Sequence, residues 1–391
     1  MKPVIIIGTG LAGYTLAREF RKLDKNTPLF ILTADNGGFY SKPMLSNAFA
    51  QGKRAEQLVT QTAVQMAGQL SATIMTGTRV AAVDTRAKTV ETSSGTFPYD
   101  KLVLAVGAQP IRLAINGDAA EEVLSVNHID DYAQFRQRLG EQSRVAILGA
   151  GLIGCEFADD LAGARHRVAV IDPNERPLAA LASPALSHGL QGALTQRGVQ
   201  FCLGTTVTRV ERKNDALGVA LADGRSLEAD VVLSAVGLRP DLRLAHASGL
   251  DTGRGIVVDA QGRTSAPDVF ALGDCTEYTT ESGTRVLPYV APIMAAARAI
   301  ARTLSGEATD IALNPSPVIV KTLSFPLALM PPPTAPKADG AWHETRYGER
   351  VVCRYYNGEG TMVGFGVAPQ EASIRQSLLA ELGSSRVTLA A

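Results

Sequence analysis

The chain has 391 residues, of which 46% are hydrophobic and 19% are charged, and its formal net charge is zero. This length predicts two or three domains. The balanced charge, without a long basic run, argues against nucleic acid as a partner. No apolar stretch reaches membrane-spanning length, and the first apolar run is too short for a secretion signal. We therefore expect a cytoplasmic protein that does not bind to a membrane.

The four cysteines, Cys155, Cys202, Cys275 and Cys353, are widely separated. Their spacing forms neither a disulfide framework nor a pair of zinc ligands, so we expect no metal site. The 37 glycines suit an α/β protein with many tight turns.

The first predicted element is a buried strand that ends at residue 7 and runs into a Gly-x-Gly-x-x-Gly turn. Its glycines are Gly8, Gly10 and Gly13, with Leu11 and Ala12 between the last two. Such a turn places the N-terminus of a helix against a pyrophosphate. The first glycine allows the turn, the second admits the phosphate, and the third lets helix and strand pack closely.

A helix over 14–23 and a strand over 29–32 complete this first βαβ unit. After the strand, only Asp35 is placed to bind ribose hydroxyls, although a solvated turn aspartate is the alternative. Lys42 and Pro43 follow, where the chain would pass the reactive end of a cofactor. A lysine beside a proline is otherwise ordinary loop chemistry.

Short strands are predicted at 72–75 and 79–83, which includes Val80, and a strand pair is predicted around 88–91 and 95–97. Residues 99–107 return to the main sheet and contain Ala105 and Gly107. We interpret 110–128 as a polar, irregular linker and the first domain boundary.

A second glycine turn follows at Gly149, Gly151 and Gly154, with Leu152 and Ile153 inside it. All three glycines have the same separation from their counterparts in the first turn. One such motif is weak evidence, but two in register indicate an internal duplication of a dinucleotide-binding turn.

The next strand, 167–171, ends at Asp172. A carboxylate there accepts hydrogen bonds from the adenosine ribose hydroxyls and repels a 2′-phosphate, whereas the alternative is a turn aspartate before proline. Further strands are predicted at 199–203, 206–210 and 218–221. A second return strand at 230–237 ends in Gly237 and echoes the first.

The last third of the chain begins with a strand over 264–274 that ends in Gly273 and Asp274. An alanine-rich helix starts near residue 289, so that Val290 lies in its first turn, and it ends near 304. From 315 onward we expect a small β-rich unit that contains Lys321. The helix could aim its N-terminal amides at an anionic ring or serve only for packing.

Together, the two turns, the paired return strands and the late Gly-Asp resemble the two-dinucleotide-domain flavoprotein reductases of the glutathione-reductase type, over about residues 3 to 310. The resemblance implies an α/β fold with two Rossmann-like domains, the NAD domain inserted in the FAD domain, and a small C-terminal α+β domain. The implied boundaries are 1–112 and 239–314 for FAD, 113–238 for NAD(P)H and 315–391 for the C-terminal domain.

The resemblance also implies that the first turn and Asp274 hold FAD and that the second turn and Asp172 hold the nicotinamide cofactor. Disulfide reductases of this type carry a redox cysteine pair beside the flavin, and related branches keep one cysteine in the segment held here by 42–44. That segment has no cysteine. Electrons must then leave the flavin directly for an external acceptor.

Several segments, including 40–46, 149–158, 235–240, 271–275 and 320–322, are similar to those of bacterial rubredoxin and flavorubredoxin reductases. This similarity implies hydride transfer from NADH to FAD, followed by single-electron steps to rubredoxin or a similar small iron protein. Such steps serve alkane hydroxylation or the detoxification of oxygen or nitric oxide. A ferredoxin or flavorubredoxin reductase, and a low-turnover flavoprotein that binds or senses, are the alternatives.

The candidate catalytic residues are Lys42, to stabilise negative charge beside the flavin, and Glu156, to pair with Lys42 and line the nicotinamide site. A helix first-turn carboxylate is the alternative for Glu156. Lys321 is a candidate flavin contact or a surface lysine. We expect NADH rather than NADPH, and either a monomer or a homodimer.

Overall fold

The computed structural model describes residues 2–280, 283–333 and 339–385. It divides into two compact units, and each is described here by itself. The first unit comprises Met1–Lys42, Glu56–Gln109 and Leu238–Asn314, and the second comprises Pro43–Ala55, Pro110–Gly237 and Pro315–Ala391. The division into FAD, NAD and C-terminal domains stays a prediction.

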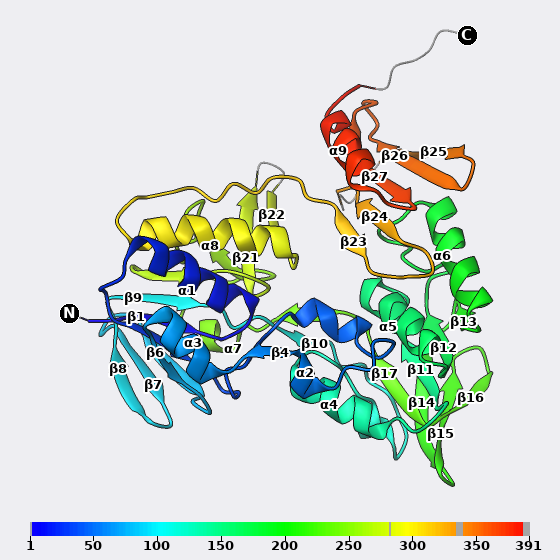
Figure 1. Ribbon diagram of the computed structural model, residues 1–391, viewed down its shortest axis with the longest axis horizontal. Helices are drawn as coiled ribbons and strands as arrows, with labels where there is room; N and C mark the ends of the chain where they lie inside the picture. The colour runs from blue at the N-terminus through cyan, green and yellow to red at the C-terminus, as the bar shows by residue number, and fades with distance from the viewer. Residues whose placement is uncertain (1, 281–282, 334–338, 386–391) are drawn as a thin grey trace. The chain divides into compact units, whose positions relative to one another are not determined.

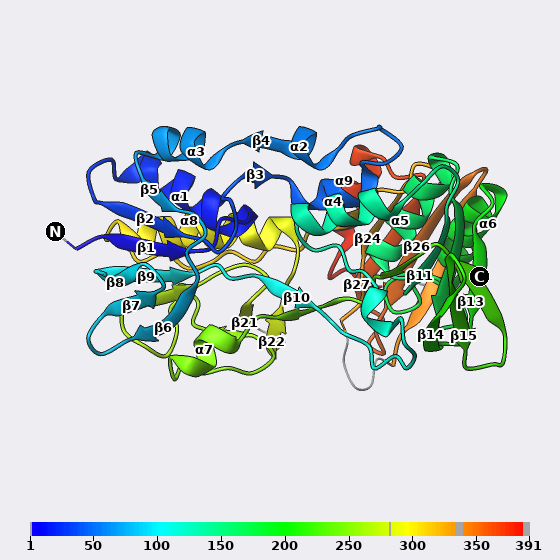
Figure 2. The ribbon, with the colours of Figure 1, turned by 90° about the horizontal axis from the view of Figure 1, so that it is seen from below.

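The first unit is built on a parallel sheet with the strand order β20-β9-β1-β2-β5. Its central strand β1 is fully buried, as continuous Val/Ile runs in parallel sheets require. Helices α1 and α8 lie side by side along this sheet (Figures 1 and 2). The bounds are β1 Val4–Ile7, α1 Leu11–Leu23, β2 Leu29–Leu32, β5 Thr73–Met75, β9 Lys101–Leu104, β20 Val269–Ala271 and α8 Val290–Leu304.

The register of this sheet brings the carboxyl ends of its strands to one edge. Ile7 pairs with Leu32 on one side and with Leu104 on the other, and Leu104 pairs with Ala271. The glycine turn, the 105–107 segment and Gly273-Asp274 therefore leave the sheet at the same edge. In open α/β sheets, ligands bind outside this edge.

Smaller elements complete the first unit, including the antiparallel sheet β6-β7-β8, the mixed sheet β19-β21-β22 and the ribbons β3-β4 and β10-β18. Their bounds are β3 Phe39–Tyr40, α2 Ala55–Leu58, β4 Val59–Gln61, α3 Ala63–Leu70, β6 Val80–Asp84, β7 Thr89–Thr92, β8 Gly95–Pro98, β10 Ala108–Pro110, β18 Leu238–Pro240, α7 Arg243–Ala247, β19 Ile256–Val258, β21 Thr276–Thr280 and β22 Gly283–Val286.

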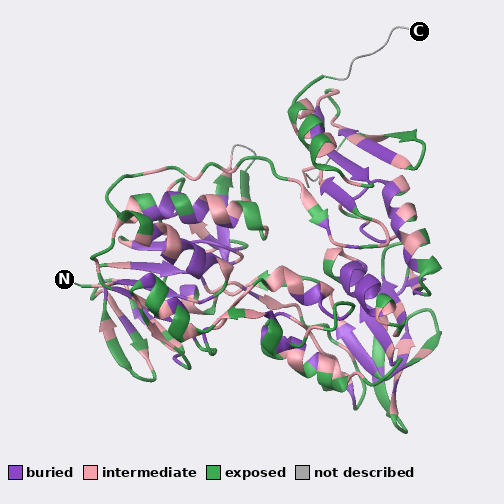
Figure 3. Ribbon diagram, viewed as in Figure 1, coloured by how far each residue is buried: buried purple, intermediate pink, exposed green. Residues whose placement is uncertain are grey.

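The second unit repeats the same parallel order, with β13-β12-β11-β17 standing for β5-β2-β1-β9. Its strands and helix α5 are largely buried (Figure 3). The bounds are η2 Ala120–Glu122, α4 Ile129–Arg138, β11 Arg144–Leu148, α5 Leu152–Gly163, β12 Arg167–Asp172, α6 Pro184–Gln196, β13 Gln200–Leu203, β14 Val207–Lys213, β15 Ala216–Leu221, β16 Ser226–Ala229 and β17 Val231–Ser234.

The C-terminal part of the second unit is an antiparallel sheet of order β23-β24-β27-β26-β25, packed against α9. Its core includes Val352, Phe365 and Val367. The bounds are β23 Val318–Val320, β24 Leu327–Met330, β25 Ala341–Tyr347, β26 Arg350–Tyr356, β27 Met362–Ala368 and α9 Ala372–Glu381. The predicted α/β class with a β-rich C-terminal part is confirmed.

Two predicted segments differ from the structure. The linker predicted at 110–128 is tied to the second unit, because Asn116 bridges to Arg209 and Leu124 bridges to Leu233. The strand predicted over 264–274 is limited to β20, because residues 259–266 form turns whose side chains bond their own backbone. In the described part of the chain, no helix is long and apolar enough to cross a membrane.

Candidate functional site

The first and third glycines of the first turn are required by contacts within the protein, independently of any ligand. Gly8 has a φ of +114°, and a Cβ there would lie 2.3 Å from the carbonyl oxygen of Ala105. A Cβ on Gly13 would lie 2.0 Å from the carbonyl oxygen of Gly8. Neither approach is possible for a real Cβ, so helix α1 sits against the strand end only with glycine at both positions.

Gly10 has a different explanation. Its φ is −67°, which any residue adopts, and a Cβ there would meet no protein atom within 4 Å. It stands before helix α1, which has no side-chain cap and no acidic residue in its first turn. Open space in front of unbonded backbone N–H groups fits a phosphate group. The residues present therefore fit the pyrophosphate of a dinucleotide.

Gly273 and Asp274 lie beside this turn. A Cβ on Gly273 would lie 2.9 Å from the Cβ of Ala12, in the first turn of α1. Burial raises the pKa of Asp274, and the charge of Lys42 opposes this rise. A half-buried carboxylate at a nucleotide-binding edge suits the hydroxyl groups of a ribityl chain, because hydroxyl donors would compensate its burial.

The other predicted residues of the first unit have these places. Asp35 is exposed, and its Oδ1 accepts hydrogen bonds from the hydroxyls of Thr9 and Thr33 and from the backbone of Gly37. Oδ1 of Asp35 therefore stabilises the loop that contains it. This agrees in part with the alternative that Asp35 is a solvated turn aspartate. Val80 begins β6, Ala105 and Gly107 follow β9, and Val290 begins α8, whose N-terminus has no side-chain cap.

The second turn repeats the geometry of the first. Gly149 has a φ of +105° and faces the carbonyl oxygen of Ala235, which a Cβ would approach to 2.7 Å. A Cβ on Gly154 would lie 1.9 Å from the carbonyl oxygen of Gly149, whereas one on Gly151 would meet nothing within 4 Å. The middle glycine before helix α5 is therefore as open as Gly10, which is compatible with a phosphate at this position. Leu152 and Ile153 begin α5, with Ile153 45% exposed, and Gly237 follows β17 with a positive φ.

Asp172 ends β12 and is buried beside this second turn. Its Oδ2 accepts a hydrogen bond from the backbone of Ala150 at 2.6 Å, and its Oδ1 accepts two from Asn174. The carboxylate is thus fixed against the turn by its own chain. Arg176 lies nearby in sequence, and its buried Nε has no hydrogen-bond partner within the described residues.

Helix α5 carries Glu156, a carboxylate that is 3% exposed. One of its oxygens lies 2.5 Å from the hydroxyl of Ser46 and 2.9 Å from Nζ of Lys321, and the other accepts the backbone N–H of Lys321 at 3.0 Å. The sequence pointed to Lys42 as the cation for Glu156, whereas this carboxylate contacts Lys321. Lys42 begins the 3₁₀ helix Lys42–Asn47.

Lys321 is held by more than this ion pair. Its Nζ donates to the carbonyl oxygen of Pro43 and to Oδ1 of Asn47 at 2.8 Å, and Asn47 in turn donates to the carbonyl oxygen of Lys321. Lys321 is therefore a paired lysine with a partly exposed side chain, and its role as a flavin contact stays a prediction. Lys321 joins the 43–47 segment, helix α5 and strand β23 within the second unit.

Two further carboxylates on α5, Asp159 and Asp160, escaped the sequence analysis. Asp160 accepts hydrogen bonds from the backbone of Phe49 and Ala50 at 2.8 and 3.0 Å, and burial raises its pKa. Asp159 accepts from the backbone of residues 323 and 324 and from Arg197. They stand three and four residues after Glu156, and hence on the same helix face. Acidic residues at this spacing in a helix expected to be buried were the available signal.

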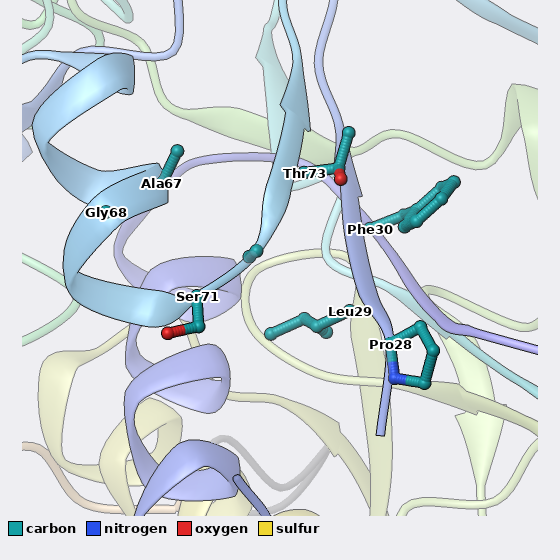
Figure 4. Close-up of a pocket in the computed structure, with 8 residues that line it drawn as sticks. Pro28, Leu29, Phe30, Ala67, Gly68, Ser71 and Thr73 are labelled. Atoms are coloured by element: carbon teal, nitrogen blue, oxygen red, sulfur yellow. The ribbon is translucent and has the colours of Figure 1, made fainter. Parts of the chain in front are cut away.

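A surface hollow in the first unit is not part of these sites. It is lined by residues at the amino ends of β2 and β5 and by α3 (Figure 4): Pro28, Leu29, Phe30, Ala67, Gly68, Ser71, Ala72 and Thr73. This edge is opposite the one that bears the glycine turn, and no charged side chain lines it. Among the residues that the structure describes, no cluster of acidic, histidine or cysteine side chains could hold a metal ion.

Two protein-family models match the chain. The model described as "Pyridine nucleotide-disulphide oxidoreductase" matches residues 2–300, and "Rubredoxin binding C-terminal domain" matches residues 310–382. Among curated relatives, the rubredoxin-NAD(+) reductase of Alcanivorax borkumensis is 43% identical over 98% of this chain and 99% of its own length. That of Acinetobacter baylyi is 42% identical over 98% of both chains. A nitric oxide reductase FlRd-NAD(+) reductase of Aeromonas hydrophila is 36% identical over 97% of this chain and 96% of its own length.

Solved structures show the same fold. The covalent putidaredoxin reductase–putidaredoxin complex contains a chain with a TM-score of 0.88 and 25% identity, covering 98% of this chain and 94% of that one. A ferredoxin reductase from Rhodopseudomonas palustris has a TM-score of 0.89 at 24% identity, covering 98% of this chain and 96% of that one, and supports the fold alone. Family enzymes of this kind use a flavin and a nicotinamide nucleotide, for which both glycine turns have the space. The chain belongs to the pyridine nucleotide-disulphide oxidoreductase family, in the branch that includes the rubredoxin-NAD(+) reductases.

Proposed function

We propose that this protein is an FAD-dependent NADH:rubredoxin reductase. The observation that carries the proposal is the match of residues 310–382 to a rubredoxin-binding domain, together with identities of 42–43% to two rubredoxin-NAD(+) reductases over nearly the whole chain. When bound, the flavin supplies the conversion of a two-electron hydride donor into a source of single electrons for an iron protein.

The absence of a thiol in the 42–44 segment supports direct electron exit. Each of the four cysteines is buried, and burial raises the pKa of every one of them, to about 11 for Cys353. A buried, protonated thiol is a poor nucleophile. These cysteines therefore contribute packing and no disulfide chemistry.

We assign FAD to residues 1–112 and 239–314. The residues that would hold it are those of the first turn, Asp274 and the further residues that the family resemblance implies: Gly8, Gly10, Leu11, Ala12, Gly13, Asp35, Lys42, Pro43, Val80, Ala105, Gly107, Gly273 and Val290. Open space before α1 and the half-buried carboxylate of Asp274 support this assignment. The uncapped N-terminus of α8 would place partial positive charge beside an anionic ring.

We assign NADH to residues 113–238, with the second turn for its pyrophosphate and Asp172 for the adenosine ribose. The remaining contacts would come from Leu152, Ile153, Glu156 and Gly237. NADH is preferred over NADPH in this proposal because a buried carboxylate beside the 2′-position repels an added phosphate. Arg176, whose Nε has no hydrogen-bond partner among the described residues, would limit this preference.

We propose that Glu156 and Lys321 act as a pair that orients the nicotinamide end of the second site. Ser46 and Asn47 accept hydrogen bonds from Nζ of Lys321, and these hydrogen bonds hold the lysine beside Glu156. Lys42 would stabilise negative charge beside the flavin, and its charge already acts on Asp274. Positioning of this kind is what hydride transfer needs from a protein.

Steady-state kinetics with a panel of purified acceptors tests the function. The flavin of the enzyme should bleach rapidly with NADH, and rubredoxin should be the acceptor with the highest kcat/KM. A higher kcat/KM with a ferredoxin, or with the rubredoxin-like domain of a flavorubredoxin, would identify that protein and not rubredoxin as the partner. The latter outcome has a specific precedent in the relatives at 36% identity. Bleaching without turnover by any iron protein would indicate a sensing role.

A further inference from the structure

The loop that follows Lys321 combines a fixed backbone with an exposed apolar tip. Leu323 is 73% exposed, although the loop is anchored on both sides of it. The hydroxyl of Thr322 donates to the carbonyl oxygen of Phe325 at 2.7 Å. The ring of Phe325 packs on α6 at Gly189, where a Cβ would approach it to 2.5 Å. The exposure of Leu323 is thus a property of a fixed loop.

Asp159 is the residue that fixes this tip. Its carboxylate is 2% exposed, and its Oδ2 accepts hydrogen bonds from the backbone N–H groups of both Leu323 and Ser324. Its other oxygen pairs with Arg197 at 3.0 Å, which compensates the buried charge. A buried carboxylate committed to two successive loop amides sets the direction in which Leu323 points.

The sequence around the loop is almost free of charge. From Asn314 to Pro336 the only charged residue is Lys321, and its ammonium group is neutralised by Glu156. Cores of protein interfaces are depleted of charged residues, and transient electron-transfer interfaces are small. An apolar tip in a segment with one charged residue, itself paired, therefore suits a small docking contact.

We infer that the Thr322–Phe325 loop is the docking element for the iron-protein acceptor, with Leu323 as its apolar contact and Asp159 as the positioning residue. The inference rests on the proposed function, and the loop lies inside the segment that matches a rubredoxin-binding domain. The occupant is rubredoxin, whose surface at the redox centre must offer an apolar patch to meet Leu323.

The first test compares two exposed apolar residues of the same C-terminal part. Leu323→Ser should raise the KM for rubredoxin about fivefold or more, as truncation of a central contact does. Tyr347, which is 62% exposed, provides the matched control, and Tyr347→Ser should leave this KM unchanged. Ferricyanide reduction by NADH needs no docking, so rubredoxin reduction should fall relative to it in Leu323→Ser.

The second test isolates Asp159 by a matched neighbour. Asp159→Asn should raise the KM for rubredoxin with little change in kcat, whereas Asp160→Asn, which removes a comparable buried carboxylate that binds the 49–50 backbone, should not. Because Asp159 acts through the loop, Leu323→Ser should have a smaller effect in the Asp159→Asn background than in the wild type. In the Asp160→Asn background its effect should be unchanged.

Three results would overturn the inference. Equal rubredoxin KM values in Leu323→Ser and the wild type would show that Leu323 is not a docking contact. Additive effects of Leu323→Ser and Asp159→Asn on this KM would show that Asp159 does not act by positioning Leu323. A change in oligomeric state of Leu323→Ser, measured by light scattering, would assign the loop to a second copy of this chain. If the wild-type protein itself fails to reduce rubredoxin, the proposed function fails first, and the two failures are distinguishable.

Discussion

The carboxylate of Glu156 and the ammonium group of Lys321 lie 2.9 Å apart, although 165 residues separate them in the sequence. Glu156 is almost fully buried, whereas the side chain of Lys321 is 30% exposed. Burying a carboxylate is costly unless a cation and hydrogen bonds compensate it. Lys321 therefore compensates the burial of Glu156 within the second unit, in addition to any role of the pair toward a ligand.

Removing the cation should expose this cost. We expect Lys321→Met to destabilise the protein by about 2 kcal/mol, because Glu156 keeps its burial and loses its ion pair. Glu156→Gln combined with Lys321→Met should restore part of this loss, since no charge remains buried. Calorimetric unfolding of the two single variants and the double variant measures the coupling. Additive losses would mean that the pair contributes nothing as a pair.

The glycines without packing constraints should matter only for ligands. Gly10→Ala should leave the stability of the flavin-free protein unchanged or higher by about 0.5 kcal/mol, because φ is ordinary and the Cβ has space. Flavin content after purification should nevertheless fall severely. Gly8→Ala is the contrasting variant, and it should unfold or aggregate because of its φ and the nearby carbonyl oxygen of Ala105. Full flavin retention in Gly10→Ala would refute the assigned phosphate position.

The choice of nicotinamide cofactor should depend on Asp172. We expect kcat/KM to be about tenfold or more higher with NADH than with NADPH, because a carboxylate beside the 2′-position opposes the added phosphate. Asp172→Asn should lower the ratio of kcat/KM with NADH to kcat/KM with NADPH. Arg176→Ala should lower kcat/KM with NADPH. A wild-type protein that uses NADPH better would show that Asp172 serves only the turn, through Ala150 and Asn174.

Stability at low pH should depend on Asp268, which forms ion pairs with Lys101 and Lys88. Hydrogen bonds from these lysines, Lys101 first, lower the pKa of Asp268. The unfolded chain then binds this proton more readily, so the stabilisation is present above the ordinary aspartate pKa and is lost as the pH falls through the folded value.

Asp268→Asn should therefore cost about 1 kcal/mol at neutral pH and progressively less toward pH 3. Asparagine is a suitable replacement because Asp268 has a φ of +63°, which asparagine adopts easily. Urea unfolding at a series of pH values gives the difference. A gap between variant and wild type that is constant with pH would indicate a loss of backbone fit and no ionic contribution.

A variant without Cys155, Cys202, Cys275 and Cys353 should still transfer electrons. All four thiols are buried with raised pKa values, so Ala or Ser replacements should cost stability and little activity. NADH-dependent rubredoxin reduction, followed by visible absorbance, is the measurement. A folded variant with full flavin content but without this activity would reveal a thiol relay.

The sequence predicted the elements whose causes are local. The glycine turns follow from a few adjacent residues, and their duplication predicted two similar sheets. The partner of Glu156 could not be predicted in the same way, because Lys321 reaches it only after the chain has built the second unit. The spacing of Asp159 and Asp160 in a buried helix was a local signal that they are unusual, but their partners could not be predicted, because the amides come from distant loops.

The two glycine turns have the same geometry, so in the proposed assignment the glycines alone do not distinguish FAD from NADH. Discrimination must arise where the halves differ, and the strand order locates one difference: the first sheet continues past β9 to β20, which delivers Asp274 to the binding edge. In the proposed assignment, the site that contains Asp274 would hold its dinucleotide permanently, whereas the other site would release its nucleotide after each turnover. In the proposed assignment, the additional strand β20, and not the glycine turn, distinguishes the site of a prosthetic group from the site of a substrate.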